Sequence, residues 1–192
     1  TIGRELSRGG ADIGHLVADP FGIPCYNKTI LDKTAEKLQF DKELVEKYDE
    51  RPNSIWRNVA GYQYGYSWYL SDPSLLQPLN ESIAMEQFEA IRRFAKEGPC
   101  VIIGRCADYV LREREDVLNV FIRADLEKRV ARTQRLYDLS AADAQKLIKK
   151  TDRIRAAYYE GHTDRKWGAP GTFDLILDSG RLGLQATVDL II

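Results

Sequence analysis

The chain has 192 residues, of which 44% are hydrophobic and 30% are charged, a composition typical of a globular domain with a buried core. A formal net charge of -1 gives no indication of nucleic acid or an anionic membrane as a partner, so any anion binding is expected to be local. No apolar run approaches the ~20 residues that span a bilayer and no signal segment is recognisable, so we expect a cytoplasmic protein. Three cysteines and two histidines without metal-binding spacing predict free thiols and no metal site.

The first half of the chain is expected to alternate between helices and short strands. Gly9 and Gly10 precede apolar residues at helical spacing, which predicts a tight turn that opens a helix. Residues 23–26 form a strand candidate, and Asp41 is expected to cap a helix. Asn80 is expected to cap a later amphipathic helix.

Between these segments, residues from 51 to about 80 are rich in aromatic side chains but have weak periodicity. This pattern indicates an insertion between core elements. Aromatic residues in an insertion more often form a small satellite core or an oligomer contact than a platform for a base.

Two continuous apolar runs, residues 100–103 and 117–122, have the length of parallel strands covered on both faces. The helix after the second run is expected to turn Leu126 and Val130 toward the core and Arg129 elsewhere.

The C-terminal part continues the alternation. Ser140 with Asp143 forms a capping-box-like start for a long helix, and a last strand is expected at 174–178 before an amphipathic helix. Alternating strands and helices predict an α/β fold in which a parallel sheet carries helices on both faces.

The glycine turn suits a phosphate group. A strand that enters a glycine turn and then a helix directs several backbone N–H groups and the positive end of the helix dipole to one point. Glycine permits a close approach and a positive φ. Taken alone, Gly9 and Gly10 with Gly14 fit equally well a turn that only packs a helix against a strand.

Further motifs follow in a fixed order along nearly the whole chain. The segments are residues 1–5, 9–14, 21–28, 98–109, 152–153, 158–159, 166–168 and 174–175. In this order they resemble the cytidylate-kinase-like family of P-loop nucleotide kinases.

The resemblance implies one kinase domain over residues 1–192, with a five-stranded parallel sheet and helices on both faces. It places a monophosphate-binding insertion at about 51–80 and a helical lid at about 150–172. It also implies transfer of the terminal phosphoryl group of a nucleoside triphosphate, such as ATP with Mg²⁺, to an acceptor such as CMP. The expected partners are small-molecule nucleotides, not nucleic acid or a membrane, and the aromatic insertion could join chains in a homo-oligomer.

The loop departs from the standard pattern G-x-x-x-x-G-K-[ST], in which the lysine reaches the transferred phosphate and the hydroxyl binds Mg²⁺. With Gly10 as the second glycine, Glu5, Ala11 and Asp12 stand at the first glycine, lysine and hydroxyl positions. Arg8 could supply the missing charge or could be a solvated surface residue.

The other candidate residues follow strands or lie near the lid. By resemblance, Arg105 would hold the acceptor phosphate with Asn27 and Asp108 nearby, although a structural salt bridge between Arg105 and Asp108 is the competing interpretation. Arg153 and Arg155, with Arg8, would bring charge to the transferred phosphoryl group. The residues expected around the donor are Ser7, Arg8, Gly9, Gly10, Ala11, Asp12, Arg129 and Arg132.

Three functions remain open at this point. The first is a nucleotide kinase, the second is a nucleotide-binding pseudokinase that senses or scaffolds without turnover, and the third is a kinase for another small molecule. Ala11 separates the first two, because it removes the side chain that usually reaches the transferred phosphate.

Overall fold

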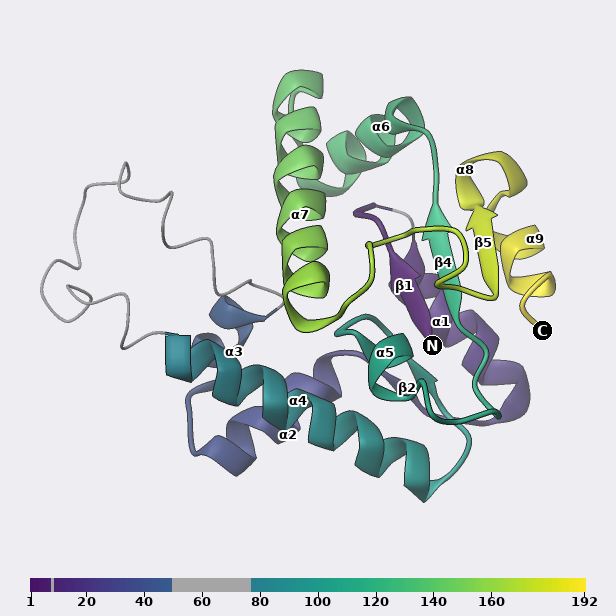
Figure 1. Ribbon diagram of the computed structural model, residues 1–192. Coiled ribbons are helices and arrows are strands. Elements are labelled where there is room, and N and C mark those ends of the chain that lie inside the picture. The colour runs from purple at the N-terminus through teal and green to yellow at the C-terminus, as the bar shows by residue number, and fades with distance from the viewer. Residues whose placement is uncertain (8, 50–76) are drawn as a thin grey trace, which may run out of the picture.

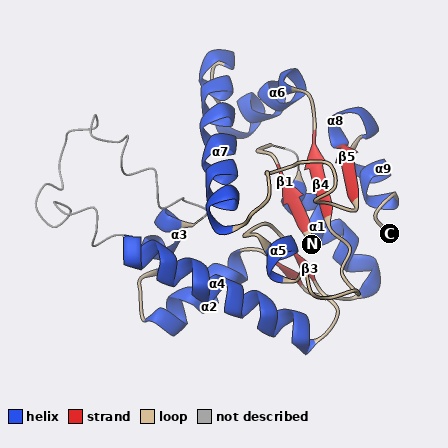
Figure 2. Ribbon diagram, viewed as in Figure 1, coloured by secondary structure: helices blue, strands red, loops and turns tan. Residues whose placement is uncertain are grey.

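The computed structural model describes residues 1–7, 9–49 and 77–192. Within these ranges, short strands alternate with helices (Figures 1 and 2). The strands are β1 (Ile2–Arg4), β2 (Cys25–Tyr26), β3 (Val101–Ile102), β4 (Val120–Arg123) and β5 (Leu175–Asp178). The helices are α1 (Gly10–Ala18), the 3-10 turn η1 (Asp19–Phe21), α2 (Lys28–Leu38), α3 (Lys42–Tyr48), α4 (Gln77–Glu97), α5 (Ala107–Val110), α6 (Leu126–Tyr137), α7 (Ala141–His162), α8 (Ser179–Leu182) and α9 (Leu184–Asp189).

The strands are all parallel, but they form two ladders where we expected one continuous five-stranded sheet. β1, β4 and β5 make one ladder, and β2 and β3 make the other. A parallel bridge between Ile2 and Ile103, and a 3.0 Å hydrogen bond from the Gly104 amide to the Ile2 carbonyl, connect the two. The ladders separate because Gly104, Arg105 and Cys106 all have positive φ, which turns the chain away from β1 soon after β3.

Helices cover both faces of the strands, as the sequence predicts. On one face, Ile13 of α1 and Val188 of α9 belong to the same buried cluster as Ile2 and Ile122 of the strands. On the other face, side chains of α4, α5 and α7 form a second buried cluster around Ile102. This arrangement leaves the carboxyl ends of the strands next to α6 and α7.

Predicted helix starts agree with the structure at several places. Asp41 occupies the N-cap position of α3 but forms no side-chain cap hydrogen bond there, whereas the Ser140 hydroxyl accepts a 3.1 Å hydrogen bond from the Asp143 amide at the start of α7. The cap predicted at Asn80 is wrong, because α4 begins before this residue. Asparagine at a helix start is a weak signal, since the same residue also occurs inside a first turn.

The predicted inward face of α6 is also wrong in part. Leu126 is 37% exposed, whereas Arg129 is buried. Two carboxylates and a backbone carbonyl bind the Arg129 guanidinium inside the protein, which offsets the cost of removing its charge from water. Hydropathy spacing treats arginine as a surface residue and carries no information about such partners.

Arg8 and residues 50–76 lie outside the described residues, so the interpretations of Arg8 and of the aromatic insertion stay predictions. Residues 77–80, at the end of the expected insertion, belong to α4. Across 1–7, 9–49 and 77–192, no helix combines the length and the apolar character needed to cross a bilayer. The three cysteines, which all lie in the described ranges, are not joined in disulfides, and Cys106 is buried.

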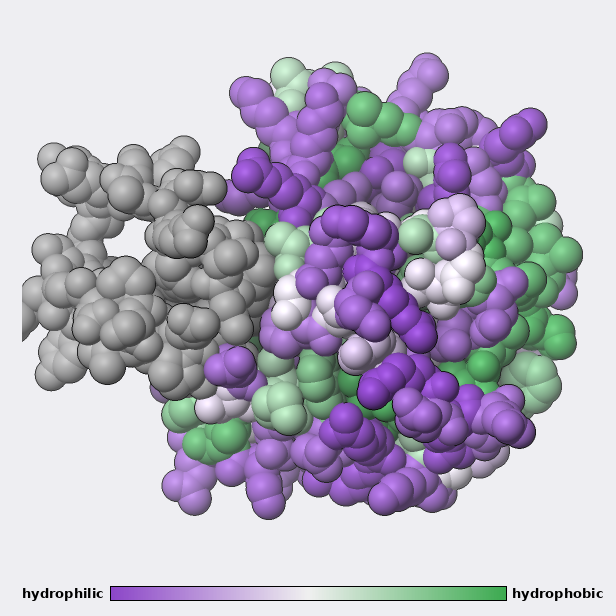
Figure 3. Space-filling model, in the orientation of Figure 1, coloured by the Kyte–Doolittle hydropathy of each residue, from purple (hydrophilic) through white to green (hydrophobic). Residues whose placement is uncertain are grey.

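Exposed apolar side chains gather over α8 and α9, where Figure 3 shows a green region at the right of the view. The residues concerned are Leu182, Leu184, Leu190 and Ile192. The surface over α7, by contrast, is largely hydrophilic in the same view. The edge of the molecule next to the carboxyl ends of the strands is therefore a polar one.

Candidate functional site

The turn between β1 and α1 has a backbone suited to an anion. Gly9, the N-cap residue of α1, adopts a left-handed conformation with φ 72° and ψ 18°, which costs little only for glycine. Gly10 packs against Arg4 so closely that a Cβ atom at this position would lie 2.8 Å from the Arg4 Cγ. Because Gly9 has no side chain to bind the first amides of α1, a phosphate group is a suitable acceptor for them.

A cation from α6 lies beside this helix end. The Nη2 atom of Arg132 is 2.6 Å from the Oδ2 atom of Asp12, and it would be 3.6 Å from a Cβ atom built on Gly9. Both charged side chains are partly exposed, so their ion pair adds little to stability. Asp12 and Arg132, which we predicted near the donor, are therefore together at the helix N-terminus.

The loop before Gly9 is held by buried charges. Arg129 forms ion pairs with Asp152 of α7 and Glu5, and its Nε donates a 3.1 Å hydrogen bond to the Leu6 carbonyl. Asp152 in turn accepts a 2.8 Å hydrogen bond from the Leu6 amide. These contacts place Arg129, predicted to touch the donor, where it positions the loop.

Ser7 adopts a positive φ of 59°, unusual for a residue with a side chain. Its Oγ atom lies 2.7 Å from the Oγ1 atom of Thr133 on α6, so the two hydroxyl groups share a hydrogen bond. The loop is thus tied to both α6 and α7. The backbone of Ala11 lies in the first turn of α1.

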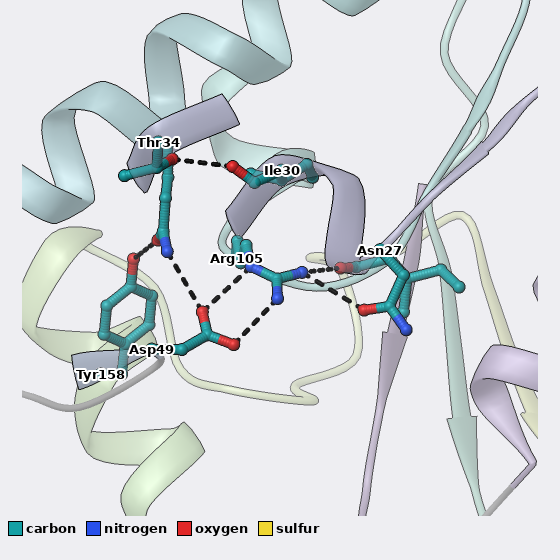
Figure 4. Close-up of polar contacts among 8 residues, drawn as sticks. Asn27, Ile30, Thr34, Asp49, Arg105 and Tyr158 are labelled. Carbon is teal, nitrogen blue, oxygen red and sulfur yellow. Dashed lines mark hydrogen bonds and ion pairs between the residues drawn. The ribbon is translucent and has the colours of Figure 1, made fainter. Parts of the chain in front are cut away.

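Arg105 lies just beyond β3 and is almost completely buried, with 2% of its side chain exposed. Its Nε and Nη2 atoms donate hydrogen bonds of 3.0 and 2.8 Å to the two carboxylate oxygens of Asp49 (Figure 4). Its Nη1 atom donates to Asn27 Oδ1 and to the Ile103 carbonyl, each at 3.3 Å. Arg105 and Asn27 are therefore brought together as predicted.

Asp108 is buried on α5, where its Oδ2 atom accepts a 2.6 Å hydrogen bond from the hydroxyl of Tyr159 on α7. The carboxylate partner of Arg105 is thus Asp49, and the Arg105–Asp108 salt bridge considered above is not among the ion pairs of the described residues. Burial raises the pKa of Asp108 above its usual range, although the hydrogen bond from Tyr159 acts in the opposite direction. Burial, followed by the hydrogen bond to Asp108, also raises the pKa of Tyr159.

The raised pKa of Asp108 predicts a pH dependence of stability. A group whose pKa is higher in the folded state binds its proton more tightly there, so its contribution to stability is lost as pH rises from the ordinary aspartate pKa of about 3.9 through the higher folded value. Asp108→Asn removes this titration. We expect the free energy of unfolding of the wild type, relative to the variant, to fall with rising pH from about pH 4 and then to level off. Urea unfolding at a series of pH values measures both proteins, and parallel curves would contradict the assignment.

Arg155 of α7 joins Arg4, Arg105 and Asp108 around a small cavity at the carboxyl ends of the strands. Arg153, on the same helix, is exposed. Of the predicted lid, 150–172, the first part is the C-terminal half of α7 and the rest is the connection toward β5. A larger cavity of about 590 Å³ lies at the opposite, amino ends of β1, β3 and β4, away from the loop and from Arg105.

Three residues at this edge were missed by the sequence analysis. Arg4 is the last residue of β1, and Arg105 stands shortly after the end of β3. This similar position at the carboxyl end of a strand could have identified Arg4. Tyr159 lies in the motif 158–159, but its partner could not be inferred from that motif, and Asp49 gave no signal, because each acquires its role from a partner far away in the chain.

The residues that could hold a cofactor are the first turn of α1 for phosphate groups and Asp12 for a cation carried by them. In the part of the chain that the structure describes, no group of three or more His, Cys, Asp or Glu residues is arranged to hold a metal ion. The arrangement offers two kinds of group that suit an anion, the first amides of α1 and the guanidinium of Arg105.

Known proteins resemble this chain in sequence and in fold. Residues 1–181 match the cytidylate kinase-like family. The chain belongs to this family. The match extends over the glycine turn, Arg105 and most of the C-terminal region, and it confirms the resemblance read from the ordered motifs.

Solved structures resemble this member of the cytidylate kinase-like family over almost its whole length. An uncharacterized protein from Eubacterium ventriosum ATCC 27560 is 27% identical with a TM-score of 0.71, and the alignment covers 99% of this chain and 93% of that chain. TT1252 from Thermus thermophilus is 17% identical with a TM-score of 0.51 and the same coverage, which shows a shared fold. No curated protein sequence gives a significant match.

Proposed function

We propose that the chain transfers the terminal phosphoryl group of a nucleoside triphosphate to a nucleoside monophosphate such as CMP. The observation that carries this proposal is the position of two anion-binding elements at one edge of the fold. The glycine turn follows β1 and Arg105 follows β3, and a parallel bridge makes these strands neighbours. Ligands in open α/β folds collect at the carboxyl ends of such strands.

In this proposal, the amides at Gly9 and Gly10 bind donor phosphates at the N-terminus of α1. Arg132 adds a positive charge beside them, at the position where it now pairs with Asp12. Arg129 acts as a positioning residue, because its contacts reach the loop backbone at Leu6.

The acceptor side consists of Arg105 and Asn27. Asp108 acts on this side indirectly, through Tyr159, whose hydroxyl it holds in a hydrogen bond. The planar guanidinium of Arg105 suits the oxygens of a phosphate group. Arg155 lines the small cavity that Arg4 and Arg105 also line. Arg153 is exposed, so its proposed role in offsetting charge on the transferred phosphoryl group requires a movement of its side chain or of α7.

MgATP would supply the phosphoryl group together with a divalent charge that is held mostly by phosphate oxygens. The described residues fit this cosubstrate at the uncapped N-terminus of α1. Asp12 lies in the first turn of α1, and its pairing with Arg132 means that it must exchange partners before it can contact the metal.

A second candidate function is a nucleotide-binding pseudokinase. The observation that favours it is the pair Ala11 and Asp12 at the positions where P-loops carry lysine and a hydroxyl residue. A kinase for a small molecule other than a nucleotide is a further version of the first proposal, since a fold does not determine its acceptor.

The test is a phosphoryl-transfer assay with ATP or GTP, Mg²⁺ and a panel of nucleoside monophosphates, accompanied by a binding titration with the triphosphate. We expect transfer to at least one monophosphate, with CMP as the first acceptor to try. Intact triphosphate binding without transfer to any member of the panel would eliminate the kinase and leave the pseudokinase.

A further inference from the structure

The carboxylate of Asp49 occupies the edge of Arg105 that a phosphate group would use. Two hydrogen bonds, of 3.0 Å to Nε and 2.8 Å to Nη2, join the two side chains in a bidentate pair (Figure 4). Arginine binds phosphate through the same parallel pair of N–H groups. Asp49 and an acceptor phosphate therefore compete for one set of donors.

The remaining donors of Arg105 do not offer an equivalent place. Its Nη1 atom points to Asn27 Oδ1 and the Ile103 carbonyl, which come from the start of α2 and the end of β3. The side chain of Arg105 is only 2% exposed, whereas that of Asp49 is 19% exposed. Within the pair, Asp49 is therefore the side chain that is more accessible to solvent.

Asp49 is also linked to two helices. Gln87 of α4, which is fully buried, donates a 3.2 Å hydrogen bond from Nε2 to Asp49 Oδ1. The Tyr158 hydroxyl of α7 donates to Gln87 Oε1 at 3.2 Å. Displacement of Asp49 would break its hydrogen bond with Gln87 and so affect a chain of contacts that reaches α7, the helix that also carries Arg155.

We propose that Asp49 competes with the acceptor's phosphate group for Arg105 and thereby sets the affinity of the acceptor site for phosphorylated ligands. A phosphate dianion brings more charge to Arg105 than a carboxylate and can replace it, whereas an uncharged hydroxyl compound cannot. Asp49 therefore lowers the affinity of the site for ligands that bind through a phosphate group and has no effect on ligands that lack one. The inference rests on the proposed function in that it takes Arg105 as the acceptor's anchor.

The test is a calorimetric titration of CMP, cytidine and inorganic phosphate into the wild type, Asp49→Asn and Asp49→Ala. Removal of the competing charge is expected to lower the Kd for CMP about tenfold, a difference of about 1.4 kcal/mol. Inorganic phosphate is expected to bind more tightly as well. Cytidine binding is expected to stay unchanged. Glu43→Gln, an equal change of charge at an exposed position of α3, is the matched control and should bind CMP as the wild type does.

Circular dichroism and thermal melts establish that both Asp49 variants are folded. If CMP binds no more tightly to either folded variant than to the wild type, or if no protein binds CMP or phosphate, Asp49 is not a competitor and the inference fails. A crystal structure of the wild type with CMP provides a second readout, in which bound phosphate with the Asp49–Arg105 pair still intact would also overturn it.

These titrations involve no turnover, so they separate the inference from the proposed function. Tighter CMP binding to the variants, together with intact triphosphate binding by the wild type but no transfer to any monophosphate of the panel, would support the competitor and refute the nucleotide kinase. Transfer by the wild type without tighter CMP binding to the variants would support the kinase and refute the competitor.

Discussion

Replacing Arg105 with alanine is expected to raise the Kd for CMP about 100-fold while leaving the Kd for the triphosphate nearly unchanged. Removing one partner from a buried charged contact costs about 2–5 kcal/mol, and Arg105 is the buried cation on the acceptor side. The donor phosphates are expected at the turn before α1, which does not depend on this side chain. Separate titrations of the two nucleotides measure the difference.

The same substitution leaves Asp49 without its cation, so a loss of stability must be distinguished from a loss of binding. Arg105→Ala with Asp49→Ala removes both charges and serves as the comparison, because it leaves no unpaired carboxylate. Arg92→Ala on α4, where the arginine is exposed, is a control for the change of charge. An unchanged Kd for CMP in folded Arg105→Ala would remove Arg105 from the acceptor site.

Arg129→Met is expected to lower the free energy of unfolding by about 3–5 kcal/mol, since it leaves carboxylates of Asp152 and Glu5 without their buried partner. For a chain of this size, the melting temperature should fall by about 10 °C. Triphosphate binding should weaken as well, because the Leu6 carbonyl loses its hydrogen bond and the loop before Gly9 loses a support. Urea unfolding and a triphosphate titration measure the two effects.

Arg135→Met, an exposed position on the same helix, provides the matched control and should change stability only slightly. In Arg129→Met with Asp152→Leu, part of the lost stability should return, because one of the unpaired carboxylates is gone. A loss below about 1 kcal/mol in Arg129→Met would mean that its partners remain solvated, contrary to the buried arrangement.

Periodicity and motif order were sufficient for the general architecture. Strand-length apolar runs and amphipathic spacing predicted parallel strands with helices on both faces, because these patterns report which side chains must leave water. The division into two ladders was not predictable in this way. It depends on positive φ at Arg105 and Cys106, which are not residues that usually signal such a turn.

The glycine turn shows what local sequence can determine by itself. Gly9 and Gly10 predicted a turn that opens a helix, because glycine adopts the left-handed conformation at little cost and, without a Cβ atom, permits the close packing found there. The order of the motifs added the cytidylate kinase-like family. Both are properties of neighbouring residues or of their sequence along the chain, so they required no knowledge of distant contacts.

The partners of the charged residues were decided only by the tertiary structure. Arg105 is bound by Asp49, 56 positions away, and Leu6 is bound by Asp152, 146 positions away. Ion pairs and hydrogen bonds of this kind act over a few ångströms in space and leave no periodic trace in the sequence. The sequence thus determined that anions are expected at the turn and at Arg105, while folding decided that a carboxylate of the chain itself already holds Arg105.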